Sequence, residues 1–327
     1  MPIIELLGSG SAGFGTVSGV TTSIGTLNGI PSLTGLRIGK DDAALSYFGG
    51  VRGRLSPTSA YDTIYNLTLS DGSTTGMGGR VAFDTNATAF ELQLPGSGPN
   101  VRIGLYVNGL RADLPLVTVP DTGGTYYVKF DLSGYARAGG WNSVEVEFYN
   151  GGTFGDIVLS EGSEMSSFSN SGPRVAFLGD SFSEGTGASS PQNDYASLVG
   201  HALGTADIWQ SAFGGTGYAR PLGNRPALVD RIGTDGVAAQ ADIYVVAMGI
   251  NDSGDITDEV RQTLATLTAG VPTAKIFVIG SWNAWAPAPI GNAAIVDQIR
   301  SVAHEFPSVV YLDSSTVEFS KAGTTHP

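Results

Sequence analysis

In the first half of the chain, apolar residues recur at every second position. Four runs show this best, at residues 90–94, 101–107, 126–132 and 144–148, where Val, Ile, Leu, Phe and Tyr alternate mainly with charged or polar residues. Such alternation is typical of strands that bury one face and expose the other. Turn residues, as in 120–124, separate the runs. The pattern predicts an all-β sandwich over residues 36–160, with one face of each strand in water.

The second half has a different period. Short apolar runs at 175–178, 243–248, 276–279 and 309–312, with a weaker one at 207–212, are typical of buried strands. Between them, apolar residues recur at helical spacing, at Val260, Leu264 and Leu267 and again from Ile295 to Phe306. We interpret these stripes as the core-facing sides of helices. Strands that alternate with helices predict an α/β domain over residues 174–327, with a parallel sheet of about five strands.

Two further segments lack either period. Residues 1–35 alternate Gly, Ser and Thr with single aliphatic residues, which predicts an irregular arm that contacts another subunit. Residues 161–173 are rich in Gly, Ser, Asn and Pro, so we expect a linker there.

The composition narrows the class of protein. The net charge is −13, from 30 acidic and 17 basic residues, and no cluster of Lys or Arg is present, which argues against nucleic acid and against an anionic membrane surface as partners. Cysteine is absent, so disulfides, thiolate metal sites and cysteine nucleophiles are excluded. The three histidines lie in separate segments without the spacing of metal ligands, so we expect no metal site. The sequence also lacks a glycine-rich phosphate-binding loop, so we expect no cofactor.

The chain also carries indications of where the protein works. No apolar run approaches the roughly 18 residues that a membrane span needs. The first eight residues, 1–8, lack a basic start and an extended apolar run, so we see no signal peptide. The 47 glycines are about twice the usual share, which suits the many turns of β-rich extracellular or virion proteins.

The candidate chemistry lies where the predicted strands end. The run 175–178 stops at Gly179-Asp-Ser181, with a helix expected within about a dozen residues. This places the Ser181 hydroxyl at the carboxyl edge of the sheet, where open α/β folds bind ligands. An ordinary helix-capping serine is the alternative interpretation. Two more segments, 213–218 (Phe-Gly-Gly-Thr-Gly-Tyr) and 248–252 (Met-Gly-Ile-Asn-Asp), and a late His326 accompany it.

This ordered set of serine, glycine, asparagine and histidine resembles the SGNH (GDSL-type) hydrolase superfamily over about residues 173–327. The resemblance implies a three-layer α/β/α sandwich and acyl transfer, with Ser181 as nucleophile and His326 as base. The backbone N–H groups of Ser181 and Gly215 and the side-chain amide of Asn251 would hold the oxyanion. Gly214 lies close enough to Gly215 that the register could differ by one.

The sequence departs from the superfamily pattern near its end. Relatives usually carry an aspartate three residues before the histidine, where this chain has Gly323, and they usually continue with a final helix beyond it. Asp313, at the end of the last strand, is an alternative acid. A Ser–His dyad supported by a backbone carbonyl, as in some carbohydrate esterases of the superfamily, is another. We expect the remaining histidines, His201 and His304, to be surface residues.

The substrate is suggested by two tryptophans. Trp282 and Trp285 follow the predicted strand 276–279 and leave the same edge of the sheet as Ser181, where they could stack on sugar rings or cover the core. A jelly-roll domain followed by an SGNH domain resembles carbohydrate esterases that deacetylate plant polysaccharides and phage tail proteins that deacetylate bacterial glycans.

The sequence therefore predicts a serine esterase that removes O-acetyl groups from an acetylated polysaccharide or other glycan, outside the cell or on a virion. The oligomeric state stays open, and a homo-oligomer such as a trimer would suit a tail protein. Two alternatives remain. One is a glycan-binding or structural phage-tail module with an inactive hydrolase domain. The other is a general short-chain esterase or a lipase, although no long apolar lid segment is present.

Overall fold

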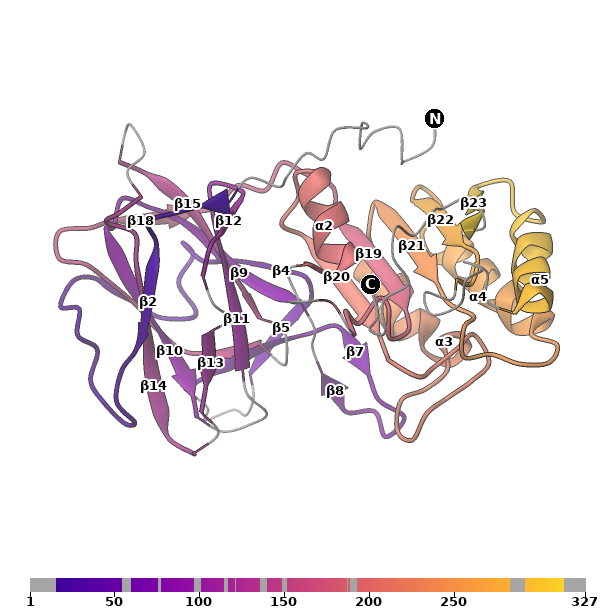
Figure 1. Ribbon diagram of the computed structural model, residues 1–327, viewed down its shortest axis with the longest axis horizontal. Coiled ribbons are helices and arrows are strands. Elements are labelled where there is room, and N and C mark those ends of the chain that lie inside the picture. The colour runs from indigo at the N-terminus through magenta and orange to yellow at the C-terminus, as the bar shows by residue number, and fades with distance from the viewer. Residues whose placement is uncertain are drawn as a thin grey trace. The chain divides into compact units, whose positions relative to one another are not determined.

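The structure is a computed structural model that describes residues 16–54, 60–75, 78–96, 101–114, 117–120, 122–135, 140–148, 152–186, 188, 193–282 and 292–314. The chain divides into two compact units. The first is formed by Met1–Tyr65 and Gly78–Ser171, and the second by Asn66–Met77 and Gly172–Pro327. Figure 1 labels their helices and strands.

The first unit is built from strands. In chain order these are β1 Thr16–Val17, β2 Thr21–Ile24, β3 Arg37–Ile38, β4 Ser46–Phe48, β5 Val51–Arg54, β6 Asp62–Tyr65, β9 Gly79–Thr85, β10 Ala89–Pro95, β11 Val101–Val107, β12 Leu110–Ala112, β13 Val117–Val119, β14 Thr125–Asp131, β15 Asn142–Phe148, β16 Gly152–Phe154, β17 Ile157–Leu159 and β18 Met165–Ser167. An eight-stranded sheet follows the order β1-β12-β11-β15-β9-β18, with β13 on β11 and β4 on β9. A five-stranded sheet follows the order β2-β14-β10-β17-β3, and β16-β6-β5 form a small third sheet.

One hydrophobic core joins the two larger sheets. Phe83 of the eight-stranded sheet meets Phe90 of the five-stranded sheet edge to face, with ring centroids 5.3 Å apart. Phe90 in turn stacks on Phe130 at 4.9 Å, and all three side chains are fully buried. Because each sheet turns one face of its alternating residues into this core, the unit is a β-sandwich, as the period of two predicts.

Some charged residues on the outer face of the eight-stranded sheet are buried, although the alternating pattern predicted exposure to water. Arg80 is 0% exposed, Glu145 5% and Glu147 2%. The Arg80 guanidinium lies 3.0 Å from Glu145 Oε2 and 3.4 Å from Glu147 Oε1. The prediction of a water-exposed face was wrong at these positions, because paired opposite charges can be buried where single charges cannot.

The second unit is an α/β domain. Its sheet consists of β19 Val175–Gly179, β20 Ile208–Ala212, β21 Ile243–Ala247, β22 Lys275–Ile279 and β23 Val309–Leu312, all parallel, in the order β20-β19-β21-β22-β23. Its helices are α2 Tyr195–Ala202, α3 Leu228–Arg231, α4 Thr257–Gly270 and α5 Ala293–Ala303, with a π turn η2 Ile232–Gly236 and a 3₁₀ turn η3 Val237–Ala239. The prediction of about five parallel strands is confirmed.

The helices of this unit cover both faces of the sheet. Ala196 of α2 packs on one face, against Val175 and Phe177. Helices α3, α4 and α5 lie on the other face, where their apolar stripes meet residues such as Leu178 and Val246. The arrangement is the three-layer sandwich that the sequence predicted. Among the described residues, no helix is long and apolar enough to cross a membrane.

Local sequence explains where these helices start. The Asp194 carboxylate accepts a hydrogen bond from Ser197 N at 2.7 Å and caps α2, and Asn292 Oδ1 accepts from Ala294 N at 3.1 Å and caps α5. Helix α4 has two acidic residues, Asp258 and Glu259, in its first turn. Their negative charges interact favourably with the positive end of the helix dipole.

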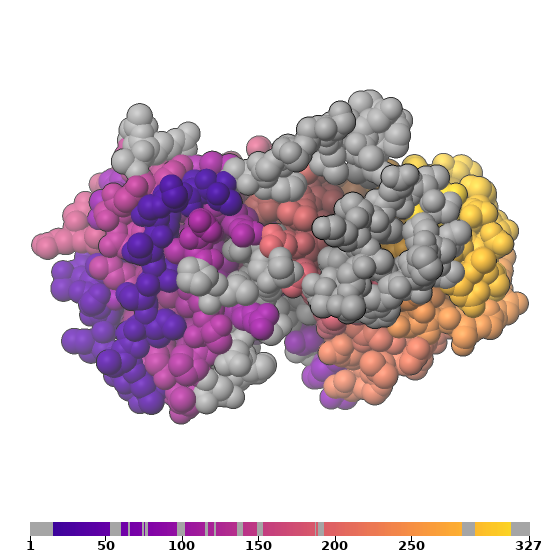
Figure 2. All heavy atoms as spheres, viewed as in Figure 1, coloured from indigo at the N-terminus to yellow at the C-terminus, as the bar shows by residue number. Residues whose placement is uncertain are grey.

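A hairpin that precedes β9 in the chain belongs to the second unit. It consists of β7 Leu67–Thr68 and β8 Thr74–Thr75. The carbonyl of Asn66 accepts from Ser211 Oγ of β20 at 3.0 Å, and Ser70 N donates to the carbonyl of Asn224 at 2.9 Å. In Figure 2 its violet atoms lie against orange atoms of the α/β domain. The hairpin is therefore attached to the α/β unit through β20 and the loop of Asn224.

Beneath the hairpin lies a buried ion pair. Arg231 Nη1 is 3.1 Å from Asp235 Oδ2, and Arg231 and Asp235 are 1% and 0% exposed. The same guanidinium donates to the carbonyls of Ser211 and Gly179, at 3.0 and 3.1 Å, and Thr68 N donates to Asp235 Oδ1 at 3.0 Å. Burial lowers the pKa of Arg231 and raises that of Asp235, whereas their mutual attraction acts in the opposite direction for both groups.

The two units differ from the expected boundaries at three places. Residues 66–77 belong to the α/β unit rather than to the sandwich. The described part of the expected arm 1–35 contains β1 and β2, which pair with β12 and β14. The expected linker 161–173 contains β18, which pairs with β9. In each case the pairing partner lies far away in the sequence, so that local composition did not reveal it.

Removing the charge of Asp235 should destabilise the second unit. In Asp235→Asn the buried Arg231 cation loses its counter-charge, and we expect a loss of about 3–5 kcal/mol in the free energy of unfolding. Urea unfolding of the full chain measures it. The matched control is Asp258→Asn, since Asp258 pairs with Arg261 in water and is 95% exposed. Equal effects of the two substitutions would contradict this role of the buried pair.

Candidate active site

Ser181 stands in the turn that follows β19. It is partly exposed, and its hydroxyl makes no hydrogen bond with the residues that the structure describes. The turn is held by Glu184 N, which donates to the carbonyl of Asp180 at 2.9 Å, and by Thr186 N, which donates to that of Ser181 at 2.9 Å. The expected helix begins at Tyr195, slightly later than predicted. The turn therefore fixes the backbone of Ser181 and leaves its hydroxyl available.

The neighbouring Ser183 is not available in this way. It is fully buried, and its hydroxyl lies 2.5 Å from that of Tyr195. Only Ser181 of the two presents a free hydroxyl, in agreement with its interpretation as the candidate nucleophile.

The second predicted segment follows β20, the neighbour of β19. Gly215 has φ +79°, and a Cβ there would lie 2.4 Å from Leu222 Cδ2, so a side chain at this position would be strained and crowded. A Cβ on Gly214 would lie 3.4 Å from Ser181 Cβ and 2.2 Å from Glu184 Oε2. The glycine pair thus lets the backbone of this loop approach the serine closely.

Arg225 orients the peptide group between these two glycines. Its Nη1 donates to the carbonyl of Gly214 at 3.1 Å and lies 3.3 Å from Glu184 Oε1. In a trans peptide the C=O and the following N–H point in opposite directions. Holding the Gly214 carbonyl at Arg225 therefore directs the Gly215 N–H away from Arg225. This N–H donates to no described group.

Asn251 follows β21 on the other side of β19. The loop turns at Gly249, whose φ is +117° and where a Cβ would lie 2.8 Å from Ile299 Cδ1. One hydrogen of the Asn251 amide is used, because Nδ2 donates to the carbonyl of Thr216 at 2.9 Å. This bond ties Asn251 to the loop of Gly215 and leaves the second hydrogen for a ligand.

Asp252 holds the same loop in place. Its carboxylate accepts from three consecutive backbone N–H groups, those of Tyr218 at 2.8 Å, Ala219 at 3.1 Å and Arg220 at 3.2 Å. Burial raises the pKa of Asp252, while these three bonds oppose the rise. From the sequence, Asp252 was noted only as the last residue of the segment 248–252. Its position directly after a candidate donor was the available signal.

The strand order brings these pieces to one edge. Ser181, the Gly214–Gly215 loop and Asn251 follow β19, β20 and β21, which are adjacent in the sheet. All three strands are parallel, so their carboxyl ends lie at the same edge of the sheet. The strand order reverses at β19, because β20 lies on one side of it and β21, the next strand in the chain, lies on the other. Open α/β folds bind their ligands at such a reversal. The arrangement offers a hydroxyl together with three N–H donors, which suits a reaction that develops negative charge on oxygen.

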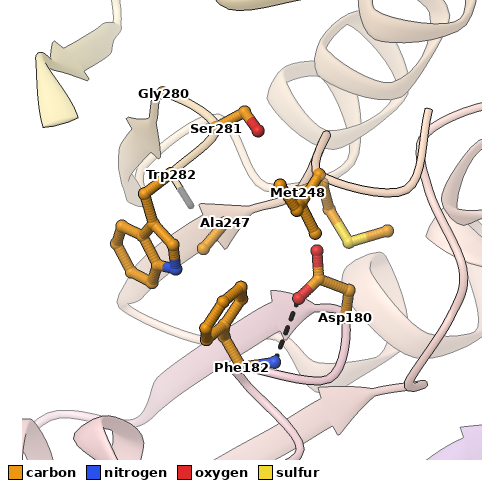
Figure 3. A pocket seen from close by; sticks show the side chains of 8 residues that line it. Asp180, Phe182, Ala247, Met248, Gly280, Ser281 and Trp282 are labelled. Atoms are coloured by element: carbon orange, nitrogen blue, oxygen red, sulfur yellow. Dashed lines mark hydrogen bonds between the residues drawn. The ribbon is translucent and has the colours of Figure 1, made fainter. Parts of the chain in front are cut away.

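A small pocket lies beside this edge (Figure 3). It has a volume of about 10 Å³, close to the need of one water molecule. Its walls include the two neighbours of Ser181 and residues at or just after the ends of β21 and β22. The lining residues are Asp180, Phe182, Ala247, Met248, Ile250, Gly280, Ser281 and Trp282. Ser281 Oγ is buried without a hydrogen-bond partner among the described residues. The Trp282 ring meets Phe182 edge to face at 5.7 Å.

The Asp180 carboxyl group points into this pocket (Figure 3). It is 2% exposed and accepts a hydrogen bond from Phe182 N at 3.0 Å. Burial raises the pKa of Asp180 from its ordinary value of 3.8 to about 7, although the bond from Phe182 opposes the rise. A carboxyl group that is partly protonated at neutral pH therefore stands directly before the candidate nucleophile.

The remaining predicted residues are placed only in part. Asp313 follows β23, is 39% exposed and lies 4.0 Å from Arg300 Nη2. His304 is exposed at the end of α5, as expected, whereas His201 in α2 is half-buried. His326, Gly323 and Trp285 lie outside the described residues. The structure thus brings Ser181, Gly215, Asn251 and Trp282 to one edge of the sheet and leaves the base untested.

Comparisons with known proteins give the family context. Residues 177–326 match the sequence model of the GDSL-like Lipase/Acylhydrolase family. A search of curated protein sequences found no match.

Several solved structures share the fold of nearly the whole chain. The salicylyl-acyltransferase SsfX3 from a tetracycline biosynthetic pathway has a TM-score of 0.66 at 18% identity, covering 89% of this chain and 92% of its own. A family two carbohydrate esterase from Cellvibrio japonicus has 0.61 at 17%, covering 90% and 89%. The acetyl xylan esterase Est2A from the rumen bacterium Butyrivibrio proteoclasticus has 0.62 at 14%, covering 85% and 90%.

At such identities these structures establish the fold and not the substrate. The matched family model covers the three strand ends described above, together with the late histidine segment. Residues 177–326 therefore form an SGNH (GDSL-type) lipase/acylhydrolase domain, which follows a β-rich unit as in the carbohydrate esterases of the same fold.

Proposed function

We propose that this protein is a serine esterase that removes O-acetyl groups from a polysaccharide or other glycan through an acetyl-serine intermediate. The observation that carries the proposal is the meeting of a free serine hydroxyl with three N–H donors at the carboxyl ends of β20, β19 and β21. The similarity to carbohydrate esterases supports it on the level of the fold.

In the proposed reaction, Ser181 Oγ attacks the acetyl carbonyl carbon while the base takes its proton. The carbonyl oxygen becomes negative and accepts from the N–H groups of Ser181 and Gly215 and from Asn251 Nδ2. Collapse of this intermediate expels the sugar alcohol, which takes the proton from the base. Water then attacks the acetyl-serine, and a second tetrahedral intermediate releases acetate. We assign the base to His326, with Asp313 or a backbone carbonyl as its support.

Two features favour a small acyl group on a sugar. The pocket beside Ser181 has room for about one water molecule, so it admits the methyl group of an acetyl ester more readily than a long chain. Trp282, half-buried at the same edge, offers an aromatic face for a sugar ring. A polysaccharide substrate implies that the enzyme acts outside the producing cell, as a secreted protein or on a virion.

The first test is acetate release from acetylated polysaccharides by wild type, Ser181→Ala and His326→Ala. We expect the wild type to release acetate and each variant to lose at least about 10³-fold in kcat, since nucleophile and base act as one unit. Ser183→Ala and His304→Ala are the matched controls and should retain most of the activity. A folded wild type without activity would favour a binding module instead.

The same assay on p-nitrophenyl esters separates a deacetylase from a lipase. We expect kcat/KM to fall steadily from acetate to butyrate to octanoate, because the pocket beside Ser181 is small. Higher kcat/KM for octanoate would favour the lipase reading.

Asn251→Ala should lower kcat by about 10²- to 10³-fold, or about 3–4 kcal/mol, with little change in KM. The reason is that its amide donates to the oxyanion only when the negative charge develops. Steady-state kinetics with p-nitrophenyl acetate measure both constants. Asn224→Ala is the matched control, because the Asn224 side chain is exposed. An increase in KM at constant kcat would contradict an oxyanion donor.

Asp180 should make the stability depend on pH. In the folded protein its pKa is raised, so folding favours the protonated form, and that stabilisation is lost as pH rises from about 4 through about 7. Asp180→Asn keeps the acceptor for Phe182 N and cannot ionise. We expect its stability relative to wild type to increase by about 4 kcal/mol between pH 4 and pH 8, measured by urea unfolding.

The control for this measurement is Asp255→Asn. Asp255 is exposed, and hydrogen bonds from Thr257 lower its pKa, so its small effect should have the opposite sign. A pH-independent difference between wild type and Asp180→Asn would show that folding does not raise the pKa of Asp180.

A further inference from the structure

The β-sandwich unit has a polar pocket of its own. It has a volume of about 270 Å³ and is lined by Asp84, Trp141, Asn142, Ser143 and Ser166, all from that unit. In the strand register Asp84 of β9 stands opposite Ser143 of β15 on one side and opposite Ser166 of β18 on the other. Directly opposed residues of adjacent strands point to the same face of a sheet.

This face is the one turned away from the sandwich core. The neighbours Phe83 and Val144 are opposed in the same register and are fully buried in the core. Because successive side chains of a strand alternate between faces, Asp84 and Ser143 point outward. Three polar side chains from three adjacent strands thus meet on a rigid surface.

Trp141 adds a large aromatic side chain to these polar groups. It lies directly before β15 and is 39% exposed, whereas Trp209 in the other unit is 5% exposed. An exposed indole has a flat apolar face that gains from contact with an apolar surface of a ligand. Its place at the wall of a polar pocket is therefore typical of a binding site rather than of a core residue.

One of the polar groups, the Asp84 carboxylate, has hydrogen-bonding capacity to spare. Asp84 Oδ1 is buried and has no hydrogen-bond partner among the described residues. Asn142 is 6% exposed, and its Oδ1 accepts from Asn108 Nδ2 at 2.9 Å. That bond fixes the Asn142 amide, and its Nδ2 donates to no described group. The pocket therefore presents an unpaired acceptor on Asp84, whereas the Asn142 side chain, opposite Thr85 in the register, lies on the core face of the strand. Buried polar groups normally find partners.

We propose that this pocket binds a neutral sugar residue of a glycan. A pyranose ring has a C–H face that stacks on an indole and a rim of hydroxyls that both donate and accept. The hydroxyls donate to Asp84, while Ser143 and Ser166 add two adaptable hydroxyls that can donate or accept. Among the residues that the structure describes, the pocket lining contains no basic side chain that would attract an anion. A single carboxylate is also too few ligands for a calcium ion, which takes six to eight oxygens.

An organic ammonium group is the competing ligand, because it could lie over Trp141 and pair with Asp84. It would accept no hydrogen bond from the hydroxyls of Ser143 and Ser166. A ligand that both donates and accepts satisfies the whole pocket. The site does not depend on the proposed esterase reaction, and it would let the sandwich hold a glycan without cleaving it.

The test uses the full chain with Ser181→Ala, so that no ester is cleaved during binding. Calorimetry would titrate it with neutral, unacetylated hexasaccharides of glucose, xylose, mannose, galactose and N-acetylglucosamine. We expect saturable binding of at least one of them. Adding Trp141→Ala or Asp84→Asn should weaken that binding at least tenfold.

Two controls locate the binding. Leu36→Ala removes another exposed apolar side chain of the sandwich, and Trp282→Ala removes the aromatic ring beside Ser181. Both should leave the affinity within about twofold, a limit equal to about 0.4 kcal/mol of binding free energy by the tenfold-per-1.4 kcal/mol rule. Thermal unfolding verifies that each variant is folded.

Three results would overturn the proposal. The first is no binding of any hexasaccharide at millimolar concentration. The second is binding that is lost in Trp282→Ala and kept in Trp141→Ala and Asp84→Asn. The third is tighter, Trp141-dependent binding of tetramethylammonium. Trp141→Ala in the otherwise wild-type chain should keep its turnover of p-nitrophenyl acetate, so failure of this site and failure of the esterase proposal are separate outcomes.

Discussion

The buried guanidinium of Arg231 is the contact on which the candidate site depends most. It donates to the carbonyl of Gly179, directly before the Asp180–Ser181 turn, and to that of Ser211 near the end of β20. Phe213 N donates to the same Gly179 carbonyl at 3.1 Å. One cation thus holds together the ends of the two strands that carry the serine and the glycine loop. A buried charge can do this only when it is neutralised, and Asp235 supplies the counter-charge under the hairpin of β7 and β8.

The proposed oxyanion donors are positioned by the charged side chains of Arg225 and Asp252. Arg225 holds the carbonyl of Gly214, and Asp252 holds three N–H groups of the following turn. Asn251 is bonded to that turn through the carbonyl of Thr216. Hydrogen bonds to charged groups are stronger than those between neutral groups, so they suit a loop with several glycines that has little rigidity of its own. The donors are thereby set before a substrate arrives, which is the condition for efficient electrostatic catalysis.

Sequence patterns predicted the features that depend on local periodicity. The alternation at residues 90–94 and 126–132 became β10 and β14, and the apolar runs of the second half became a five-stranded parallel sheet. Because the strands of that sheet are parallel, Ser181, Gly215 and Asn251 were expected at one edge of it, and they lie there. Sequence patterns did not predict interactions between residues that lie far apart in the chain. Glu145 and Glu147 looked like solvent-facing residues because their partner Arg80 is 65 and 67 positions away. Residues 66–77 were assigned to the sandwich because the partners of Asn66 and Thr68, Ser211 and Asp235, lie 145 and 167 positions further along the chain. The spacing of apolar residues shows which face of a strand or helix a residue occupies. It does not show which other part of the chain packs against that face.

The properties of Asp180 likewise depend on the residues that surround it in the fold. In the proposed reaction the residue lies beside the place where negative charge develops on the substrate oxygen, so an ionised carboxylate there would raise the energy of the transition state. Burial keeps the carboxyl group protonated up to about neutral pH and so removes much of that repulsion. The same burial costs folding free energy above that pH, because the unfolded chain ionises without hindrance. A residue that destabilises the fold at the working pH is retained more readily at a site of chemistry than elsewhere, and the perturbed carboxyl beside Ser181 therefore supports this edge as the active site independently of the donors.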